Sequence, residues 1–395
     1  PGFIEETIKF DLAVALTRIT FPFLFFVSLA SFFSGILNTN NRFAAAAAAP
    51  IILNIFLILS LVISNFLNLN FETNLSYAVS LAGLFQLIFL IFFTKRYYKP
   101  TISFKITISS KIKFFLKKLL PSIFSSGVTQ INILVGTIIA SFEASAVSYL
   151  YYADRIYQIN LAIAGIAIGT VALPELSKNI KKGKIARAMR MQNKSLELCL
   201  LLSLPASFGL IIASHEIVSA LFGYGSFSEE NVILTAQALK YFGFGVPAFA
   251  LIKILSNFLF ARDNTKVPFY ISAFIVFLNI LISILYFKEV GFIIIPLATS
   301  ISTWIGVLIY LILLNKFKYL NFELIFFTNL IKIVISLVIM TIALYYFINF
   351  FEDKLIYSNY YKSFYLIMIV TLASGIYLFS ARLLGVFKIK NYMTN

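Results

Sequence analysis

The chain has 395 residues, of which 60% are hydrophobic and 12% charged, and its formal net charge is +16. Soluble domains are roughly 45–50% apolar, so this composition excludes a single soluble core and indicates an integral membrane protein. With one cysteine, Cys199, and one histidine, His215, the chain has no internal disulfide framework, and a cysteine- or histidine-based metal or catalytic site is not expected. We therefore expect no metal, no cofactor and no enzymatic activity.

Apolar runs of membrane-spanning length follow one another along the chain. They lie near residues 11–38, 44–66, 75–94, 119–142, 146–173, 195–222, 232–260, 267–287, 291–314, 325–350 and 363–385. These runs predict an all-α polytopic membrane protein with eleven transmembrane helices and no soluble domain.

The basic residues gather on one side of the predicted membrane. If successive connections alternate between two sides, one side holds eight Lys and Arg in residues 95–118 and seven in 178–194. The other side holds only Lys9, Lys288, Lys354 and Lys362. The positive-inside rule makes the first side, with the C-terminus, cytoplasmic. The basic loops are therefore interpreted as topology signals and contacts with anionic membrane lipids, not as nucleic-acid sites.

A weak internal repeat relates residues 2–23 to residues 225–249. Its best-aligned pairs, separated by 224 or 225 positions, are Phe3 with Phe227, Glu5 with Glu229, Pro22 with Pro247 and Asn54 with Asn279. Both copies enter the membrane from the same side, which predicts parallel repeats with a substrate site between them. Three helices precede the second copy, so we expect three further helices ahead of Pro1 and fourteen in the intact protein.

This repeat predicts three regions. Residues 1–118 would be the remainder of an N-lobe with a basic linker, residues 119–318 a six-helix C-lobe, and residues 319–395 two C-terminal helices.

Arg155, in YYADRIYQI, is the main candidate for a functional residue. It lies about 14 Å from the outer end of its helix, close to the midplane of a bilayer core about 30 Å thick. A charge at this depth is costly unless it faces a cavity or a partner, and a guanidinium can bind phosphate bidentately. The alternative is a structural ion pair with a carboxylate of another helix.

Helical spacing places Ser148, Tyr152, Arg155 and Gln158 or Ile159 on one face. Asp154 points about 100° away from Arg155, so we expect it to bond another helix.

Two further cations lie at depth. Arg18 is a candidate for the same cavity, or it extends to the outer surface. Lys253 is a candidate for cavity charge, or it pairs with Glu197 or Glu216.

Small and kinking residues mark where helices could approach or bend. Gly165 and Gly169 form a GxxxG pattern that predicts close helix packing. The hinge candidates are the intrahelical prolines Pro22, Pro205 and Pro247.

Several motifs, in order, resemble the MurJ/MviN family of lipid II flippases. They are RITFPF, SGILNTNNRF, APIILNI, YYADRIYQI, GIAIGTVALPELSK, LFGYGSF and LFARDNTKVP, and the resemblance extends from residue 1 to about residue 325. The family belongs to the multidrug, oligosaccharidyl-lipid and polysaccharide exporter superfamily. The resemblance implies fourteen helices in two lobes around a cavity, a C-terminal helix pair that binds a polyprenyl tail, and a chain that lacks three N-terminal helices.

The resemblance also implies a substrate and a location. The substrate would be the undecaprenyl-pyrophosphate-linked disaccharide-pentapeptide, moved between leaflets of the bacterial inner membrane by alternating access in a monomer, with cell-wall synthesis proteins as partners. Arg155 falls on the arginine of the YYADR motif and Ser148 on a functional serine of the same helix. Gln158 stands where some members carry Glu, which puts an ion-pair or proton-relay role there in doubt.

Two other functions remain open from the sequence. A small-molecule antiporter of the same superfamily would need a buried carboxylate, and Asp154 is the deepest one present. A truncated chain could instead be a non-transporting scaffold, which would tolerate neutral residues at positions 18, 155 and 253.

Overall fold

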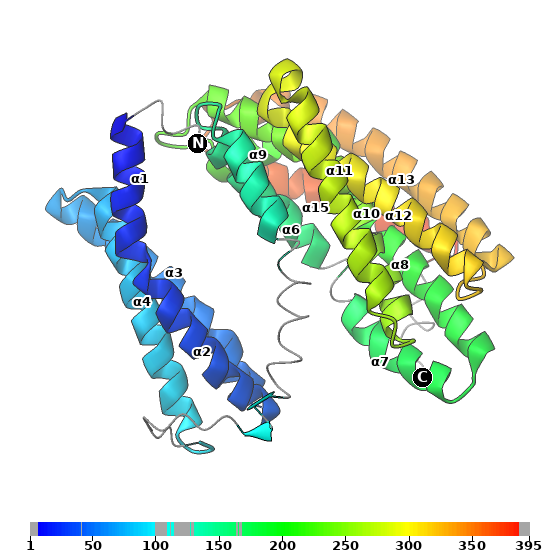
Figure 1. Ribbon diagram of the computed structural model, residues 1–395. Coiled ribbons are helices and arrows are strands. Elements are labelled where there is room, and N and C mark those ends of the chain that lie inside the picture. Colours follow the sequence, from blue (N-terminus) through cyan, green and yellow to red (C-terminus); the bar gives the residue numbers. More distant parts are fainter. Residues whose placement is uncertain are drawn as a thin grey trace. The chain divides into compact units, whose positions relative to one another are not determined.

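The computed structural model describes residues 7–40, 42–98, 109–110, 112–113, 127, 130–162, 165 and 168–386. All regular elements in these residues are helices (Figure 1). The chain forms two compact units, Pro1–Leu116 and Lys117–Asn395, each of which is described here by itself.

The first unit is built around one helix that contacts the other three. Its elements are α1 (Thr7–Thr20), α2 (Pro22–Thr39), α3 (Phe43–Leu67) and α4 (Phe71–Thr94). Helix α4 packs against α1, α2 and α3, and the Ser80 hydroxyl donates to the Ile19 carbonyl at 2.5 Å. The first apolar run, predicted as one helix, is broken at Phe21, because Pro22 begins α2 and has no N–H to continue α1.

The second unit surrounds a long central helix, α10. Its elements are α6 (Ala146–Leu161), α7 (Ile168–Lys181), α8 (Ile185–Ile212), α9 (Ser214–Phe222), α10 (Glu229–Phe260), α11 (Lys266–Val290), η3 (Gly291–Ile293), α12 (Ile294–Lys316), α13 (Leu324–Phe350), α14 (Glu352–Leu355) and α15 (Lys362–Leu383). Helix α10 begins where Ser228 accepts from the Asn231 N–H and Glu229 and Glu230 occupy the first turn. It packs against α6, α8 and α12.

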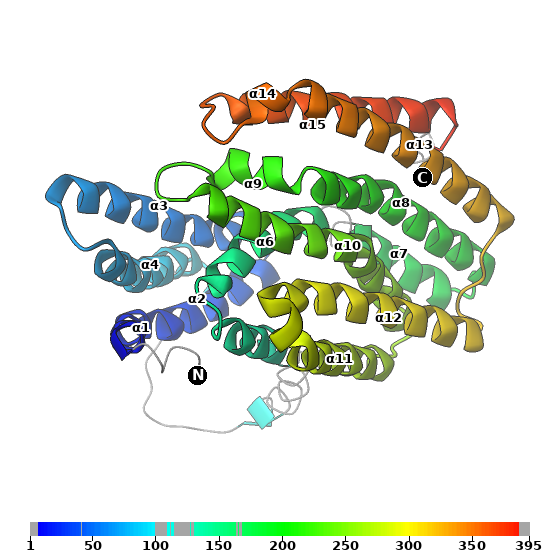
Figure 2. The same ribbon diagram turned by 90° about the horizontal axis from the view of Figure 1, so that it is seen from above.

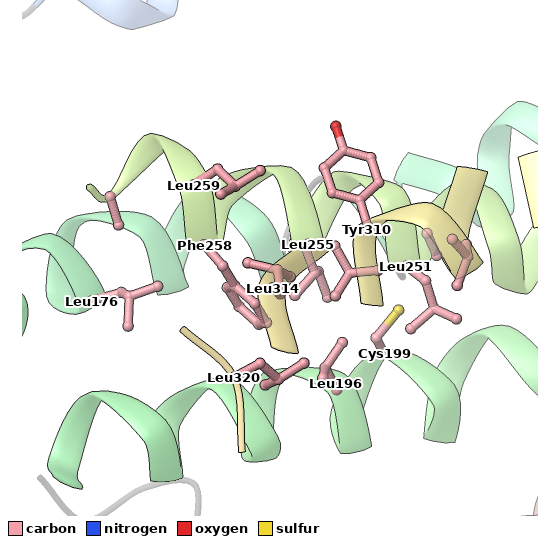
Figure 3. Packing of buried hydrophobic residues seen from close by; sticks show 14 of the residues in the cluster. Leu176, Leu196, Cys199, Leu251, Leu255, Phe258, Leu259, Tyr310, Leu314 and Leu320 are labelled. Atoms are coloured by element: carbon pink, nitrogen blue, oxygen red, sulfur yellow. The ribbon is translucent and has the colours of Figure 1, made fainter. Parts of the chain in front are cut away.

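The cytoplasmic half of this unit, on the predicted orientation, has a densely packed core. Leu251, Leu255, Phe258 and Leu259 of α10 meet residues of α8 and α12, among them Leu196, Cys199, Tyr310 and Leu314 (Figure 3). Lipid tails are as apolar as leucine, so in a bilayer such contacts stabilise through close van der Waals packing rather than through removal of water.

The GxxxG glycines bring their segment into direct contact with α10. A Cβ on Gly165 would lie 3.1 Å from the Cα of Ala250, and one on Gly169 would lie 2.8 Å from Asn257 Nδ2. Asn257 donates to the Gly169 carbonyl at 3.0 Å. The predicted close packing is thus present, and its partner is α10.

We expect Gly165→Val to destabilise the protein by about 1–3 kcal/mol, because the added carbons meet the backbone of Ala250, which cannot rotate away. Unfolding of the purified protein in detergent measures this. The control is Gly209→Ala in α8, where the new Cβ has open space and should stabilise by about 0.5–1 kcal/mol. Equal stability of the two variants would contradict the tight contact.

One other predicted helix is interrupted. The run 195–222 divides at Ala213 into α8 and α9, and α8 begins ten residues earlier, in the basic segment. In the run 146–173 the described helices are α6 and α7, and Ala162 and Gly165 have π-type backbone. Pro205 and Pro247 lie inside α8 and α10. Their role as hinges stays a prediction.

Eight helical stretches of the described residues are long and apolar enough to cross a membrane. One of them, Lys266–Lys316, has 51 residues and contains both α11 and α12. The count of eleven spans and the two-lobe repeat therefore stay predictions.

The C-terminal helix pair packs on the rest of the second unit. Helix α13 lies along α8, and α15 contacts α9 (Figure 2). Lys362 lies where the C-terminal helix pair meets the rest of the second unit, and it is only 1% exposed. Its ammonium donates to the carbonyls of Gly223 and Tyr357, each at 2.7 Å, and lies 4.4 and 4.5 Å from the ring centroids of Tyr224 and Tyr357.

Candidate functional site

One face of α6 presents a stripe of exposed polar side chains. Ser148, Tyr151, Arg155 and Gln158 are all exposed and follow one another at spacings of three, four and three residues. Tyr152, predicted on this face, instead packs against Phe222 and Phe227, with ring centroids 4.8 and 5.3 Å apart. The helical period allowed either tyrosine, and the aromatic contacts of Tyr152 decide the rotation of the helix.

Arg155 has a tyrosine as its partner. Its Nη2 donates to the Tyr151 hydroxyl at 2.8 Å, and its guanidinium carbon lies 4.6 Å from the centroid of that ring. Among the described residues, no carboxylate lies within ion-pairing distance of Arg155. The structural ion pair considered as the alternative is therefore not formed by this part of the chain.

Asp154 is held within its own helix. Gln158 Nε2 donates to its carboxylate, so the expected bond to another helix is wrong for the described residues. A glutamate at position 158 would repel Asp154, whereas the amide of Gln158 supplies the N–H that the carboxylate needs. The hydrogen bond of this carboxylate is thus made to Gln158 and not to Arg155.

Lys253 is exposed on a stretch of α10 that is otherwise covered. It is the only exposed residue of α10 between positions 245 and 259, and its side chain has no hydrogen bond or ion pair within the described residues. The pairs considered for it are wrong: Glu197 accepts from Asn329 at 3.0 Å, and Glu216 lies 4.0 Å from His215.

Lys253 and Arg155 lie at different levels of the second unit. Tyr157 of α6 contacts Phe242 and Phe249 of α10, with centroids 4.8 and 5.3 Å apart, and Lys253 follows Phe249 on that face by one turn. Tyr149 donates to Asn231, so the two helices run in the same direction. The two cations are therefore separated by roughly 14 Å along the helix axis.

Arg18 lies in the first unit, exposed in the last turn of α1. Its side chain has no contact within the described residues of that unit that would hold it. No group of three or more His, Cys, Asp or Glu among the described residues is arranged to hold a metal ion.

The fold and this face define a multi-pass α-helical membrane protein with exposed cations on apolar helices. The family described as "Lipid II flippase MurJ" matches residues 1–366. The chain belongs to this family, and with its apolar helices it is a multi-pass protein of the bacterial inner membrane.

Relatives carry the name "Probable lipid II flippase MurJ". That of Rickettsia prowazekii is 40% identical over 310 residues, which are 77% of this chain and 60% of the relative. That of Rhizobium tropici is 38% identical over 312 residues, 78% of this chain and 58% of the relative. The chain thus spans less than two thirds of the length of these relatives.

Solved structures show the same fold. The lipid II flippase MurJ in an inward closed conformation matches with a TM-score of 0.75 and 27% identity, over 93% of this chain and 73% of that one. A MATE protein in complex with MaL6 matches with a TM-score of 0.57 and 15% identity, over 79% of this chain and 70% of that one, and shows the fold alone.

Proposed function

We propose that this chain acts in moving lipid II, the undecaprenyl-pyrophosphate-linked disaccharide-pentapeptide, from the inner to the outer leaflet of the membrane. The observation that carries this is Arg155, an exposed guanidinium on a helix of the membrane fold that no described carboxylate neutralises. Such a charge in a bilayer costs a few kcal/mol or more unless an anion or water reaches it.

The pyrophosphate supplies that anion. Arg155 binds it bidentately, and Ser148 on the Arg155 face donates a hydrogen bond to the head group. Arg18, in the first unit, is a candidate phosphate ligand in its own right. Asp154, beside this face, pairs with Gln158 on it, and the carboxylate and the amide together suit sugar hydroxyls. Lys253 adds positive charge at a level nearer the cytoplasmic end of α10, on the predicted orientation.

Transport proceeds by alternating access of two lobes related by a parallel repeat, with bending at Pro22, Pro205 and Pro247.

A contact that occurs once in each unit supports the repeat. Arg42 donates to the Tyr97 hydroxyl at 2.7 Å, and the Arg262 guanidinium lies 4.4 Å from the Tyr319 ring centroid. Arg42 precedes α3 and Tyr97 follows α4. In the same way, Arg262 precedes α11 and Tyr319 follows α12.

The test is binding of lipid II to the purified 395-residue chain in lipid nanodiscs. We expect saturable binding that undecaprenyl pyrophosphate competes for and that weakens with salt, because the recognised group is an anion. Undecaprenol, which has the tail and no phosphate, is the control competitor and should not displace it. No binding, or equal competition by undecaprenol, would favour the scaffold interpretation.

A further inference from the structure

We infer that Tyr151 is a positioning residue for Arg155, which directs the guanidinium toward the anion without neutralising it. This inference rests on the proposed function, because it assigns Tyr151 a role through Arg155. It concerns a residue that the sequence pattern did not place on this face.

The contact between the two residues is a double one. Tyr151 lies one helical turn before Arg155, accepts a hydrogen bond from Nη2 at 2.8 Å, and presents its ring 4.6 Å from the guanidinium carbon. Residues four apart on a helix face one another, so the backbone itself brings the pair together. The phenol thus fixes both the position and the plane of the guanidinium.

The neutrality of the partner matters for binding an anion. A guanidinium has five N–H donors, and Tyr151 accepts from one of them. A carboxylate partner would commonly take two and cancel the charge. The one carboxylate adjacent in sequence, Asp154, accepts from Gln158 instead. Four donors therefore remain, among the described contacts, for a diphosphate.

Arg262 also pairs with a tyrosine, but two of its N–H donors are taken up by backbone carbonyls. It stacks on Tyr319 but also donates to the carbonyls of Phe258 and Tyr319, at 2.7 and 3.1 Å, so it closes a turn. Arg155 makes no carbonyl contact within the described residues. Without Tyr151, its long side chain could bend toward water at the membrane surface.

Binding of undecaprenyl pyrophosphate to the 395-residue chain in nanodiscs tests the inference. We expect Tyr151→Phe, which keeps the ring, to weaken binding about 3-fold. Tyr151→Ala should weaken it about 10-fold or more. Tyr270→Ala is the control, since Tyr270 is a tyrosine of α11 that is 67% exposed and should leave binding unchanged. Thermal unfolding should be the same for all three, because Tyr151 is itself 55% exposed.

A double-mutant cycle separates the inference from the function it rests on. In the Arg155→Ala background, Tyr151→Ala should cause no further loss, because its effect passes through the guanidinium. If Arg155→Ala itself binds normally, the proposed role of Arg155 fails. Two results would overturn the role of Tyr151 and leave that of Arg155 intact. In the first, Arg155→Ala loses binding while Tyr151→Ala and Tyr151→Phe keep it. In the second, the losses caused by the two substitutions add in the double variant.

Discussion

In the complete protein, Arg155→Ala should abolish growth rescue of a flippase-depleted bacterium while the level of the protein in the membrane stays unchanged. The guanidinium is exposed, and within the described residues its hydrogen bond and its ring contact are both to Tyr151. Its removal therefore leaves no buried group unpaired and should not unfold the chain. The loss falls on the substrate, whose pyrophosphate would enter the bilayer without its bidentate partner.

Arg155→Lys is expected to give partial rescue, because an ammonium supplies the charge but not the planar fork. The matched control is Lys316→Ala at the end of α12, which removes an exposed cation elsewhere and should rescue fully. Quantitative immunoblots of membranes establish the protein level. Full rescue by Arg155→Ala would remove this residue from the mechanism.

Lys362→Met is expected to loosen the C-terminal helix pair and lower the stability of the protein by about 2–4 kcal/mol. The substitution keeps the length of the side chain but leaves two buried carbonyls, those of Gly223 and Tyr357, without their donor. Each unpaired group costs about 1–3 kcal/mol, and the contact with two tyrosine rings is lost as well. Part of this is offset because a buried ammonium no longer has to be desolvated.

Thermal unfolding in detergent and hydrogen exchange along α15 measure the effect. Lys354→Met, nearby in α14 and exposed, is the control and should change neither. Faster exchange confined to residues near α9 and α15 is the expected pattern, since Ser363 also donates to the Ala220 carbonyl at this junction. Unchanged exchange in Lys362→Met would show that other contacts hold the pair.

The helices could be predicted because each apolar run reflects one bilayer thickness, whereas their interruptions depend on packing. Nothing in the sequence around Ala213 signals a break as clearly as Pro22 does. The choice of Tyr151 over Tyr152 shows the same limit. Both positions lie within about 60° of the Ser148 direction, and only the contacts of Tyr152 with Phe222 and Phe227 place it in the interior.

Lys362 was missed for a related reason. In the sequence it is one of four basic residues on the side predicted to be outer, at the start of a helix, where lysines are ordinarily solvated. Its burial depends on Gly223 and Tyr224, some 139 positions away, which bring a carbonyl and a ring to the ammonium. The nearby tyrosines of residues 357–361 were a signal, but aromatic residues are also common at membrane interfaces.

The burial of Cys199 makes the natural chain ready for chemical mapping. Its thiol is 0% exposed, in the core between α8 and α10 (Figure 3). Water-soluble maleimides should therefore not label the native protein, and no cysteine-free variant is needed as a starting point. A single cysteine introduced at Ser148 or Gln158 would then be the one reactive thiol. The rate at which it is labelled from either side of the membrane would report when the Arg155 face is open to water.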